Sequence, residues 1–148
     1  MGPNEMSQLR AIAVENAPKA IGPYAQGIVA GGFLFTAGQV HFDPVTMKLV
    51  SGTIAEETNR VFDNLEAILT GAGCRFADVV KTTVFLTDMG SFAEMNGAYA
   101  ARFVEVQKAD FRRLAVDHFL AGNLRVAHVQ ISFCFCRFTL IEPVRCTP

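Results

Sequence analysis

The sequence predicts an α+β fold in which two helices cover one face of a mixed β-sheet. Segments with the period of a strand occur before, between and after two segments with the period of a helix, in the order strand, strand, helix, strand, helix, strand, strand. Each helical segment opens at a capping signature, and glycine-containing pairs separate neighbouring strand segments. Helices packed on one face of a sheet form two layers, so we expect a two-layer domain.

A β-hairpin is expected near the N-terminus. Gly31-Gly32 separates two apolar, β-favouring runs at 26–30 and 33–36. A further strand is expected near 9–14.

The first helix follows a loop over 39–52. Thr53 and Glu56 form a capping-box signature, and apolar residues then recur at helical spacing until Gly71, where we expect the helix to end. The apolar residues are Val61, Leu65, Ile68 and Leu69.

A central strand and a second helix come next. Residues 79–88 alternate in a pattern rich in β-branched side chains, which predicts a strand. Ser91 and Glu94 form a second capping-box signature. The helix after it carries one stripe that we interpret as core: Phe92, Met95, Tyr99 and Phe103.

Two further strands are expected after a polar stretch at 105–110. The runs 114–120 and 124–138 are β-like, and Gly122-Asn123 between them suits a tight turn, which predicts a second hairpin. We expect a single domain over 1–148, with poor order at 1–8 and an atypical tail at 139–148.

Composition excludes several classes of function. The net charge is −1 with Lys and Arg scattered, so a nucleic-acid partner has no support, and no apolar run reaches the ~20 residues of a membrane span. Hydrophobic residues make up 51% of the chain, more apolar surface than a small monomer exposes, which favours a homo-oligomer. The polar N-terminus favours a cytoplasmic location, with a mitochondrial one left open.

Neither the cysteines nor the histidines show metal-ligand spacing. The four cysteines lack a Cys-x-x-Cys pair and a disulfide pattern, and we interpret them as reduced thiols. Glycine-rich phosphate loops and serine nucleophile elbows are absent from the sequence, so phosphoryl transfer and serine acyl transfer are disfavoured.

Three segments resemble the Rid (reactive intermediate deaminase, YjgF) family. They are Glu-Asn-Ala-Pro at 15–18, the run Ile-Gly-Pro-Tyr to Thr-Ala-Gly-Gln at 21–39, and Val-Val-Lys-Thr-Thr-Val-Phe-Leu-Thr-Asp at 79–88. The resemblance covers about 13–103 and weakens beyond. It implies a chorismate-mutase-like fold, a homotrimer with clefts between subunits, and hydrolysis of small enamines or imines to a 2-keto acid and ammonia. The electrophile is the C=N bond of the substrate, so no cofactor is implied.

The resemblance also implies site residues. Tyr24 matches the tyrosine that orients the planar substrate, and Gly38-Gln39 matches a main-chain contact where glycine permits close approach. Ala37 stands where family members often carry serine, so one hydroxyl is lost.

The family arginine, which binds the substrate carboxylate, best matches Arg113, with Arg112 as a close rival. Ala115 occupies a second position that is often cysteine in the family.

Gln130 falls at the position of the family glutamate that positions or deprotonates the attacking water. Its amide can hold a water but cannot accept a proton, which typically lowers the rate ~10²–10⁴-fold. Three functions therefore remain open: a working or weakened imine deaminase, a non-catalytic protein that binds small carboxylates or partner proteins, and, least supported, a ribonuclease.

Overall fold

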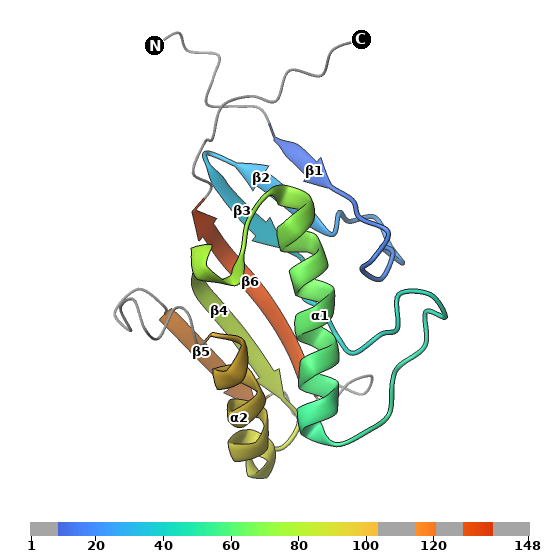
Figure 1. The fold of residues 1–148 in the computed structure, drawn as a ribbon, viewed down its shortest axis with the longest axis vertical. Helices are drawn as coiled ribbons and strands as arrows, with labels where there is room; N and C mark the ends of the chain where they lie inside the picture. The colour runs from blue at the N-terminus through green and yellow to red at the C-terminus, as the bar shows by residue number, and fades with distance from the viewer. Residues whose placement is uncertain (1–8, 104–114, 121–128, 138–148) are drawn as a thin grey trace, which may run out of the picture.

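The computed structural model describes residues 9–103, 115–120 and 129–137, and shows the expected two layers (Figure 1). The strands are β1 Arg10–Ile12, β2 Gly27–Ala30, β3 Phe33–Thr36, β4 Val79–Leu86, β5 Ala115–Leu120 and β6 Val129–Arg137. The helices are α1 Ile54–Ala72 and α2 Phe92–Arg102, with short 3-10 turns η1 Phe76–Asp78 and η2 Met89–Ser91. Both α-helices lie on the same face of the sheet, which confirms the predicted α+β fold class. The expected boundaries of the ordered domain, near residues 8 and 139, lie at or beyond the edges of the described residues.

The sheet is mixed, as predicted. Its strands follow the order β1-β2-β3-β6-β4-β5. The pair β4–β5 is parallel, and the other described pairs are antiparallel.

The predicted C-terminal hairpin is wrong. β5 and β6 do not pair, because β4 lies between them and bonds to both. A glycine-containing pair predicts that the chain turns, but it does not determine which strands pair. Here β5 and β6 each form a long set of pairs with β4, one on each edge of that strand. The described parts of the predicted runs 114–120 and 124–138 are strands, at 115–120 and 129–137. The Gly122-Asn123 pair lies outside the described residues.

The capping box of α1 is confirmed, but the predicted end of the helix at Gly71 is wrong. The Glu56 carboxylate accepts from Thr53 N at 2.7 Å, and the Thr53 hydroxyl accepts from Glu56 N at 3.2 Å. The helix passes through Gly71 and ends at Gly73, whose φ of 79° is the left-handed value that favours glycine. Gly71 has a packing role instead, since a Cβ there would clash with a Val14 methyl group.

The predicted capping box of α2 is wrong, because its glutamate serves the other helix. The Ser91 side chain makes no capping hydrogen bond. Glu94 Oε1 accepts from Ala55 N at 3.0 Å, which satisfies a free amide in the first turn of α1. Predicting a capping box from residue spacing assumes that the glutamate bonds to its own helix. Here tertiary packing places Glu94 beside the start of α1 instead.

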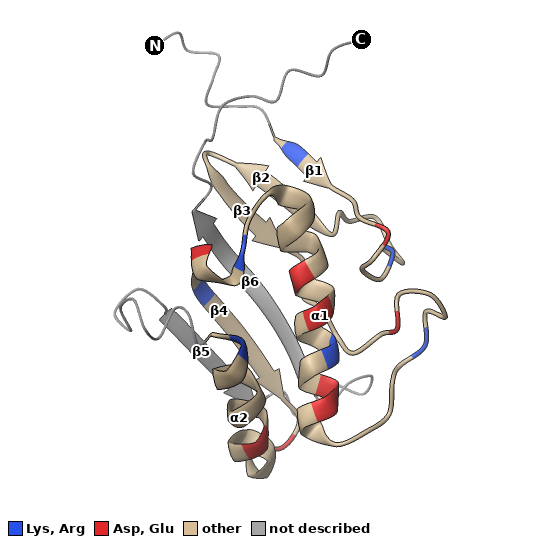
Figure 2. Cartoon of the chain, in the orientation of Figure 1, with Lys and Arg blue, Asp and Glu red and all other residues tan. Residues whose placement is uncertain are grey.

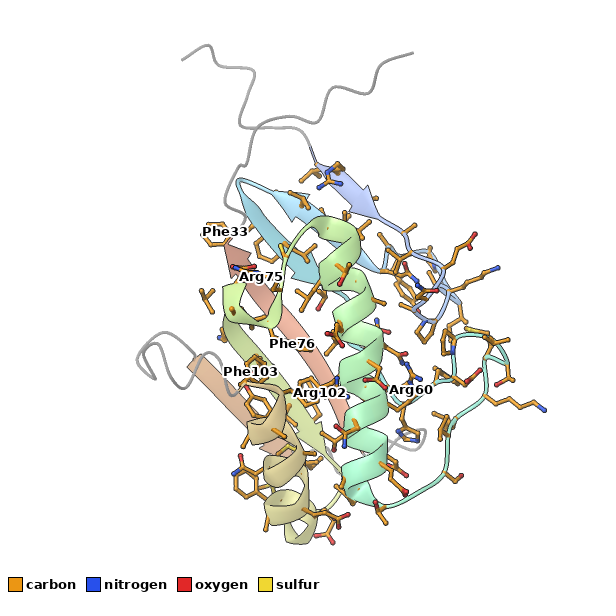
Figure 3. All side chains as sticks on the ribbon, viewed as in Figure 1. Phe33, Arg60, Arg75, Phe76, Arg102 and Phe103 are labelled. Atoms are coloured by element: carbon orange, nitrogen blue, oxygen red, sulfur yellow. The ribbon has the colours of Figure 1, made fainter. Side chains whose placement is uncertain are left out.

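The α2 stripe is core, as predicted. Met95, Tyr99 and Phe103 are buried, and Phe92 packs against the same cluster. Phe103 stacks on Tyr99 with ring centroids 4.6 Å apart. It also meets Phe76 edge-on, with ring centroids 5.4 Å apart (Figure 3). These aromatic contacts pack the end of α2 against η1.

One hydrogen bond crosses this apolar cluster, between the Tyr99 hydroxyl and the Thr82 hydroxyl of β4 at 2.8 Å. Burial raises the pKa of Tyr99 to about 12, although the bond to Thr82 acts in the opposite direction. The unfolded chain therefore releases this proton near pH 10 while the folded chain retains it, and stability falls as the pH rises from 10 towards 12.

Tyr99→Phe should abolish the part of the stability loss between pH 10 and 12 that comes from ionisation of Tyr99. It should also lower the free energy of unfolding at pH 7 by about 1–3 kcal/mol, because the Thr82 hydroxyl loses its buried partner. Urea denaturation at several pH values measures both effects. Tyr24→Phe, which removes the other tyrosine hydroxyl from an exposed side chain, is the matched control. An unchanged slope above pH 10 in Tyr99→Phe would contradict the assignment.

The loop before α1 contains a strained turn. Asp43 Oδ1 accepts hydrogen bonds from Thr46 N at 2.7 Å and from Val45 N at 3.0 Å. These bonds lower the pKa of the Asp43 carboxyl, and the bond from Thr46 has the largest effect. Met47 then adopts φ 55°, which is unfavourable for a residue with a Cβ.

Met47→Gly should raise the free energy of unfolding by about 0.5–1 kcal/mol, because relief of strain exceeds the entropy that glycine adds to the unfolded chain. Lys48→Gly, at a neighbouring exposed position with negative φ, should instead lower it. Thermal unfolding of the pair tests this, and the strain assignment fails if both variants are destabilised equally.

Candidate functional site

Two of the predicted site segments meet at the open end of the β2–β3 hairpin. The last pair of this ladder joins Gly27 to Thr36, and Ala37 N then donates to Gln26 O at 2.9 Å. Tyr24 lies just before this junction and Gly38 just after it. We call Tyr24, Ala37, Gly38 and Gln39 the hairpin-end site.

Gln26 organises the approach to Tyr24. Its side chain is 5% exposed and spans the loop before it, accepting from Val14 N at 2.6 Å and donating to Val14 O, Ala17 O and Pro18 O at 3.1, 3.2 and 2.8 Å. A single side chain thus satisfies four backbone groups that the loop would otherwise bury unpaired. Sequence reasoning missed this residue, because no local spacing pattern identifies a buried glutamine with long-range backbone partners.

Tyr24 presents its ring at the surface. It is 49% exposed, and its hydroxyl accepts from Ile21 N at 3.3 Å, which closes the turn that precedes the ring. The ring borders a cavity of about 480 Å³ beside β1, which Lys19 and Gln26 also line. An exposed aromatic ring on a concave surface can stack against a planar ligand.

Gly38 and Gln39 differ in exposure. Gly38 is exposed, so its main chain is open to a ligand, whereas Gln39 is 6% exposed and donates from Nε2 to Ala37 O at 3.4 Å. The half-buried Ala37 brings no hydroxyl. The main chain of Gly38 is therefore the accessible hydrogen-bonding group of this segment.

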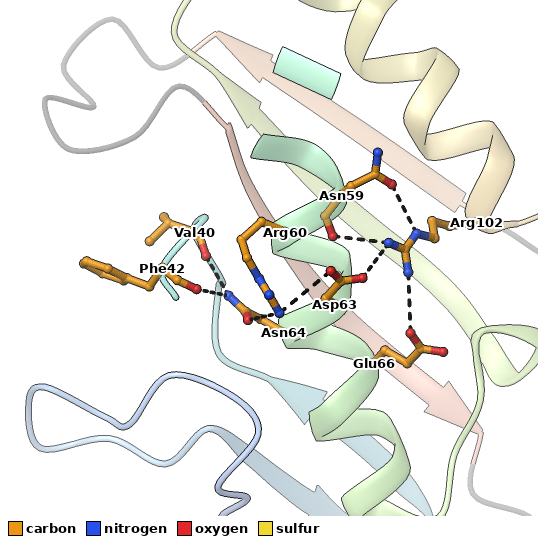
Figure 4. Close-up of polar contacts among 8 residues, drawn as sticks. All are labelled: Val40, Phe42, Asn59, Arg60, Asp63, Asn64, Glu66 and Arg102. Atoms are coloured by element: carbon orange, nitrogen blue, oxygen red, sulfur yellow. Dashed lines mark hydrogen bonds and ion pairs between the residues drawn. The ribbon is translucent and has the colours of Figure 1, made fainter. Parts of the chain in front are cut away.

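Helix α1 holds the residues that follow Gln39 (Figure 4). Asn64 Nδ2 donates to Val40 O at 3.1 Å and to Phe42 O at 2.9 Å. Between these two residues, His41 Nδ1 lies 3.6 Å from Glu57 Oε2, and both side chains are 4% exposed. Sequence reasoning missed Asn64, Glu57 and His41 as a group. The available signal was the presence of Glu57 and Asn64, seven residues apart, on a helix face that is largely apolar.

Gln130 belongs to the same end of the sheet. β3 and β6 are antiparallel with Leu34 opposite Cys136, so the chain that leaves β3 at 37–39 advances towards the Val129 end of β6. Gln130 itself lies opposite Phe85 of β4.

Ala115 lies elsewhere in the sheet. The register places it opposite Lys81, four positions along β4 from Phe85, and β5 is two strands from β6. At about 3.3 Å per residue and about 4.8 Å per strand, the main chain of Ala115 is roughly 16 Å from that of Gln130. Arg112 and Arg113 lie outside the described residues, three and two positions before Ala115, the first residue of β5.

In the described part of the chain, the register places the hairpin-end site and the Gln130 end of β6 towards one end of the sheet, and Ala115 away from Gln130. A separation of roughly 16 Å between two main-chain positions is more than a small ligand spans, so one ligand does not contact both Gln130 and Ala115 of one subunit.

Charge gives no sign of a polyanion site. In the described residues, Lys and Arg are scattered over helices, strands and loops, and α1 carries four Asp and Glu (Glu56, Glu57, Asp63 and Glu66) against the single Arg60 (Figure 2). The same residues hold no group of three or more His, Cys, Asp or Glu side chains placed to bind a metal ion. None of their helices is long and apolar enough to cross a bilayer.

Known proteins share this fold and much of this sequence. A RutC family protein of Pyrococcus horikoshii is 51% identical over 106 residues, 72% of this chain and 82% of that protein. An Escherichia coli protein named 2-iminobutanoate/2-iminopropanoate deaminase is 44% identical over 96 residues, 65% of this chain and 74% of its own. The crystal structure of E. coli TdcF with bound serine superposes with a TM-score of 0.74 at 30% identity, covering 86% and 98% of the two chains.

The family model for endoribonuclease L-PSP matches residues 14–120, which include the hairpin-end site, both α-helices and β4. The expectation drawn from the three sequence segments is confirmed, and the chain belongs to the endoribonuclease L-PSP family, the Rid (YjgF) family of proteins.

Proposed function

We propose that this protein hydrolyses reactive 2-enamine and 2-imine intermediates, such as 2-aminoacrylate, to a 2-keto acid and ammonia. The hairpin-end site carries the proposal, because the match to a family with relatives named as imine deaminases includes this site. That a relative was crystallised with serine, a small amino acid, supports a ligand of this size.

The hairpin-end site supplies orientation. The exposed Tyr24 ring stacks against the planar substrate, and the open main chain of Gly38 bonds to its polar edge. A substrate held in one orientation presents one face of its C=N bond to water.

Hydrolysis requires little further chemistry. An enamine first gains a proton at its terminal carbon and loses one from nitrogen, which gives the imine. The oxygen of water bonds to the imine carbon and loses a proton, while the C=N electron pair moves to nitrogen, which takes up a proton. A second proton then reaches nitrogen, the C–N bond breaks with release of ammonia, and the remaining hydroxyl loses its proton to become the carbonyl of the 2-keto acid. Gln130 accepts a hydrogen bond from the attacking water but no proton, so the protons travel through solvent.

The carboxylate anchor comes from a neighbouring subunit in this proposal. Arg113, with Arg112 as the alternative, precedes β5 and Ala115, which lie away from the hairpin-end site of the same chain. A homotrimer whose clefts join the hairpin end of one subunit to the β5 start of the next would complete the site.

The far face of the sheet gives such an assembly its contact surface. Leu34 faces the helices and is fully buried, so its neighbours Phe33 and Phe35 lie on the opposite face, where Phe35 is 37% exposed. Phe85 extends the same face along β4, between the buried Val84 and Leu86. Lys81 and Thr83 of β4 share this face, so the apolar part is the patch formed by Phe33, Phe35 and Phe85. Exposed apolar patches often mark contacts between proteins.

A second candidate function is binding without turnover. Gln130 and Ala37 favour it, because an arginine anchor could remain while the base and a hydroxyl are lost. Such a protein would bind small carboxylates, for example a 2-keto acid, or partner proteins.

The first experiment is a coupled assay in which a pyridoxal-phosphate dehydratase generates the enamine from serine or threonine. The native protein should accelerate release of the 2-keto acid above the spontaneous rate. Gln130→Glu should raise the rate by about 10² or more, since it restores a general base. Arg113→Ala should lower kcat/KM about 10–100-fold through loss of charge-assisted bonds, and Arg112→Ala tests the rival.

Arg75→Ala is the control, because Arg75 is exposed on η1 and pairs there with Asp78. Acceleration by Gln130→Glu alone would support the binding protein. If neither form accelerates release and neither binds pyruvate, both proposals fail.

The trimer has its own test. Light scattering should give three times the chain mass of 16.1 kDa. Phe35→Glu should reduce it by placing a charge on the far face, whereas Val45→Glu, on an exposed loop residue, should not. Coexpression of Tyr24→Ala with Arg113→Ala should recover part of the activity that each has lost, because mixed trimers contain clefts with both native residues. A monomeric mass, or no recovery on coexpression, would contradict shared sites.

A further inference from the structure

Two buried polar residues of α1 face the loop after β3. Asn64 is fully buried and Glu57 is 3% exposed, and they are seven residues apart, which places them on one stripe of the helix. The rest of this buried face is largely apolar. Burial of polar groups costs free energy unless they are bonded, so their partners show what they do.

The Asn64 side chain uses both of its functional groups. Nδ2 donates to the carbonyls of Val40 and Phe42, and Oδ1 accepts from Arg60 Nη2 at 3.0 Å. A carboxamide with these partners has one possible orientation, because only its nitrogen can donate to carbonyl oxygens.

A chain of charges from α2 holds this orientation (Figure 4). Arg102 of α2 contacts Asp63 at 2.5 Å, and Asp63 lies 3.8 Å from Arg60 Nη2, the same nitrogen that donates to Asn64. Both α-helices thus contribute to fixing one side chain against the loop.

The hairpin-end site lies between two anchors. On one side, Ala37 N is bonded to Gln26 O, and on the other, Val40 O is bonded to Asn64. The two residues between these bonds are Gly38 and Gln39. The two anchors limit how far the main chain between them can move.

We propose that Asn64 is a positioning residue for the imine hydrolysis, which fixes the main chain of Gly38 and Gln39 where it meets the substrate. The inference rests on the proposed function. Asn64 touches no reacting atom and acts through Val40 and Phe42. A glycine main chain has no side-chain packing to hold it, so the external anchors determine its geometry. The buried contact of His41 with Glu57 supports the same segment.

The test compares three variants of the full-length protein. Asn64→Leu removes all three hydrogen bonds at similar volume. Asn64→Asp keeps the acceptor for Arg60 and loses the donors to Val40 and Phe42. Thr58→Val is the matched control, since Thr58 is fully buried on the same helix and its hydroxyl bonds within α1, to Ile54 O at 2.6 Å.

Each variant is measured well below its unfolding temperature by amide hydrogen exchange over 38–42, by pyruvate affinity and by turnover in the coupled assay. Both Asn64 variants should exchange faster at 38–42 and lose about 10–100-fold in kcat/KM, with part of the loss in kcat, as expected for a misplaced binding group. Thr58→Val should lower thermal stability and leave the other readouts unchanged.

Turnover, affinity and exchange within twofold of native in Asn64→Asp would overturn the inference, as would an equal loss in Thr58→Val. If the native protein neither turns over imines nor binds pyruvate, the proposed function fails, and exchange at 38–42 alone decides whether Asn64 positions this segment. If Asn64→Leu does not fold, Arg60→Leu takes its place. It leaves Asn64 present but without its orienting donor, and a smaller loss in the same direction is expected.

Discussion

Helix α1 is the element on which the rest of the structure depends, because it supports the sheet and the site at once. Its apolar residues form much of the core. In its first turn, Ala55 N donates a hydrogen bond to Glu94 of α2. Near its last turn, Val14 packs against Gly71, where there is no side chain. Between these points, Asn64 and Glu57 hold the segment that leaves β3. A change in the position of α1 would therefore move the hairpin-end site as well as the core.

The parts of the fold that sequence predicted well were those that local periodicity determines. The β2–β3 hairpin, the Thr53 cap and the aromatic stripe of α2 each depend on residues within one turn or one strand pair. The failures all involved long-range partners. β4 separated two strands that a turn signal had joined, Glu94 capped a different helix, and Val14 explained why Gly71 does not end α1. Hydrogen-bond donors and acceptors near in sequence have no priority once packing brings others closer.

The residues of the candidate site show the same contrast between local and long-range determinants. Resemblance identified Tyr24 and Gly38, and the hairpin geometry brings these two segments together. Gln26 and Asn64 were missed, although they bond to the backbone on either side of those segments. Neither residue bears a recognisable catalytic group, and their roles depend on carbonyls that are 8–12 and 22–24 residues away in sequence. No window of sequence short enough to scan for a motif contains both ends of such contacts.

Because the side chain at position 130 is a neutral glutamine, correct positioning of the substrate matters more for the proposed reaction. Imine hydrolysis proceeds readily in water, so an enzyme gains from capture and orientation even without a strong base. A site with a glutamate can tolerate some misplacement of its substrate, because proton transfer contributes its own share of the acceleration. Without that share, nearly all of the acceleration must come from holding the C=N bond and the water in reacting geometry. Under the proposed function, the position of Gly38 and Gln39, held by Gln26 on one side and Asn64 on the other, is then the main contribution to rate that the hairpin-end site makes from within one subunit.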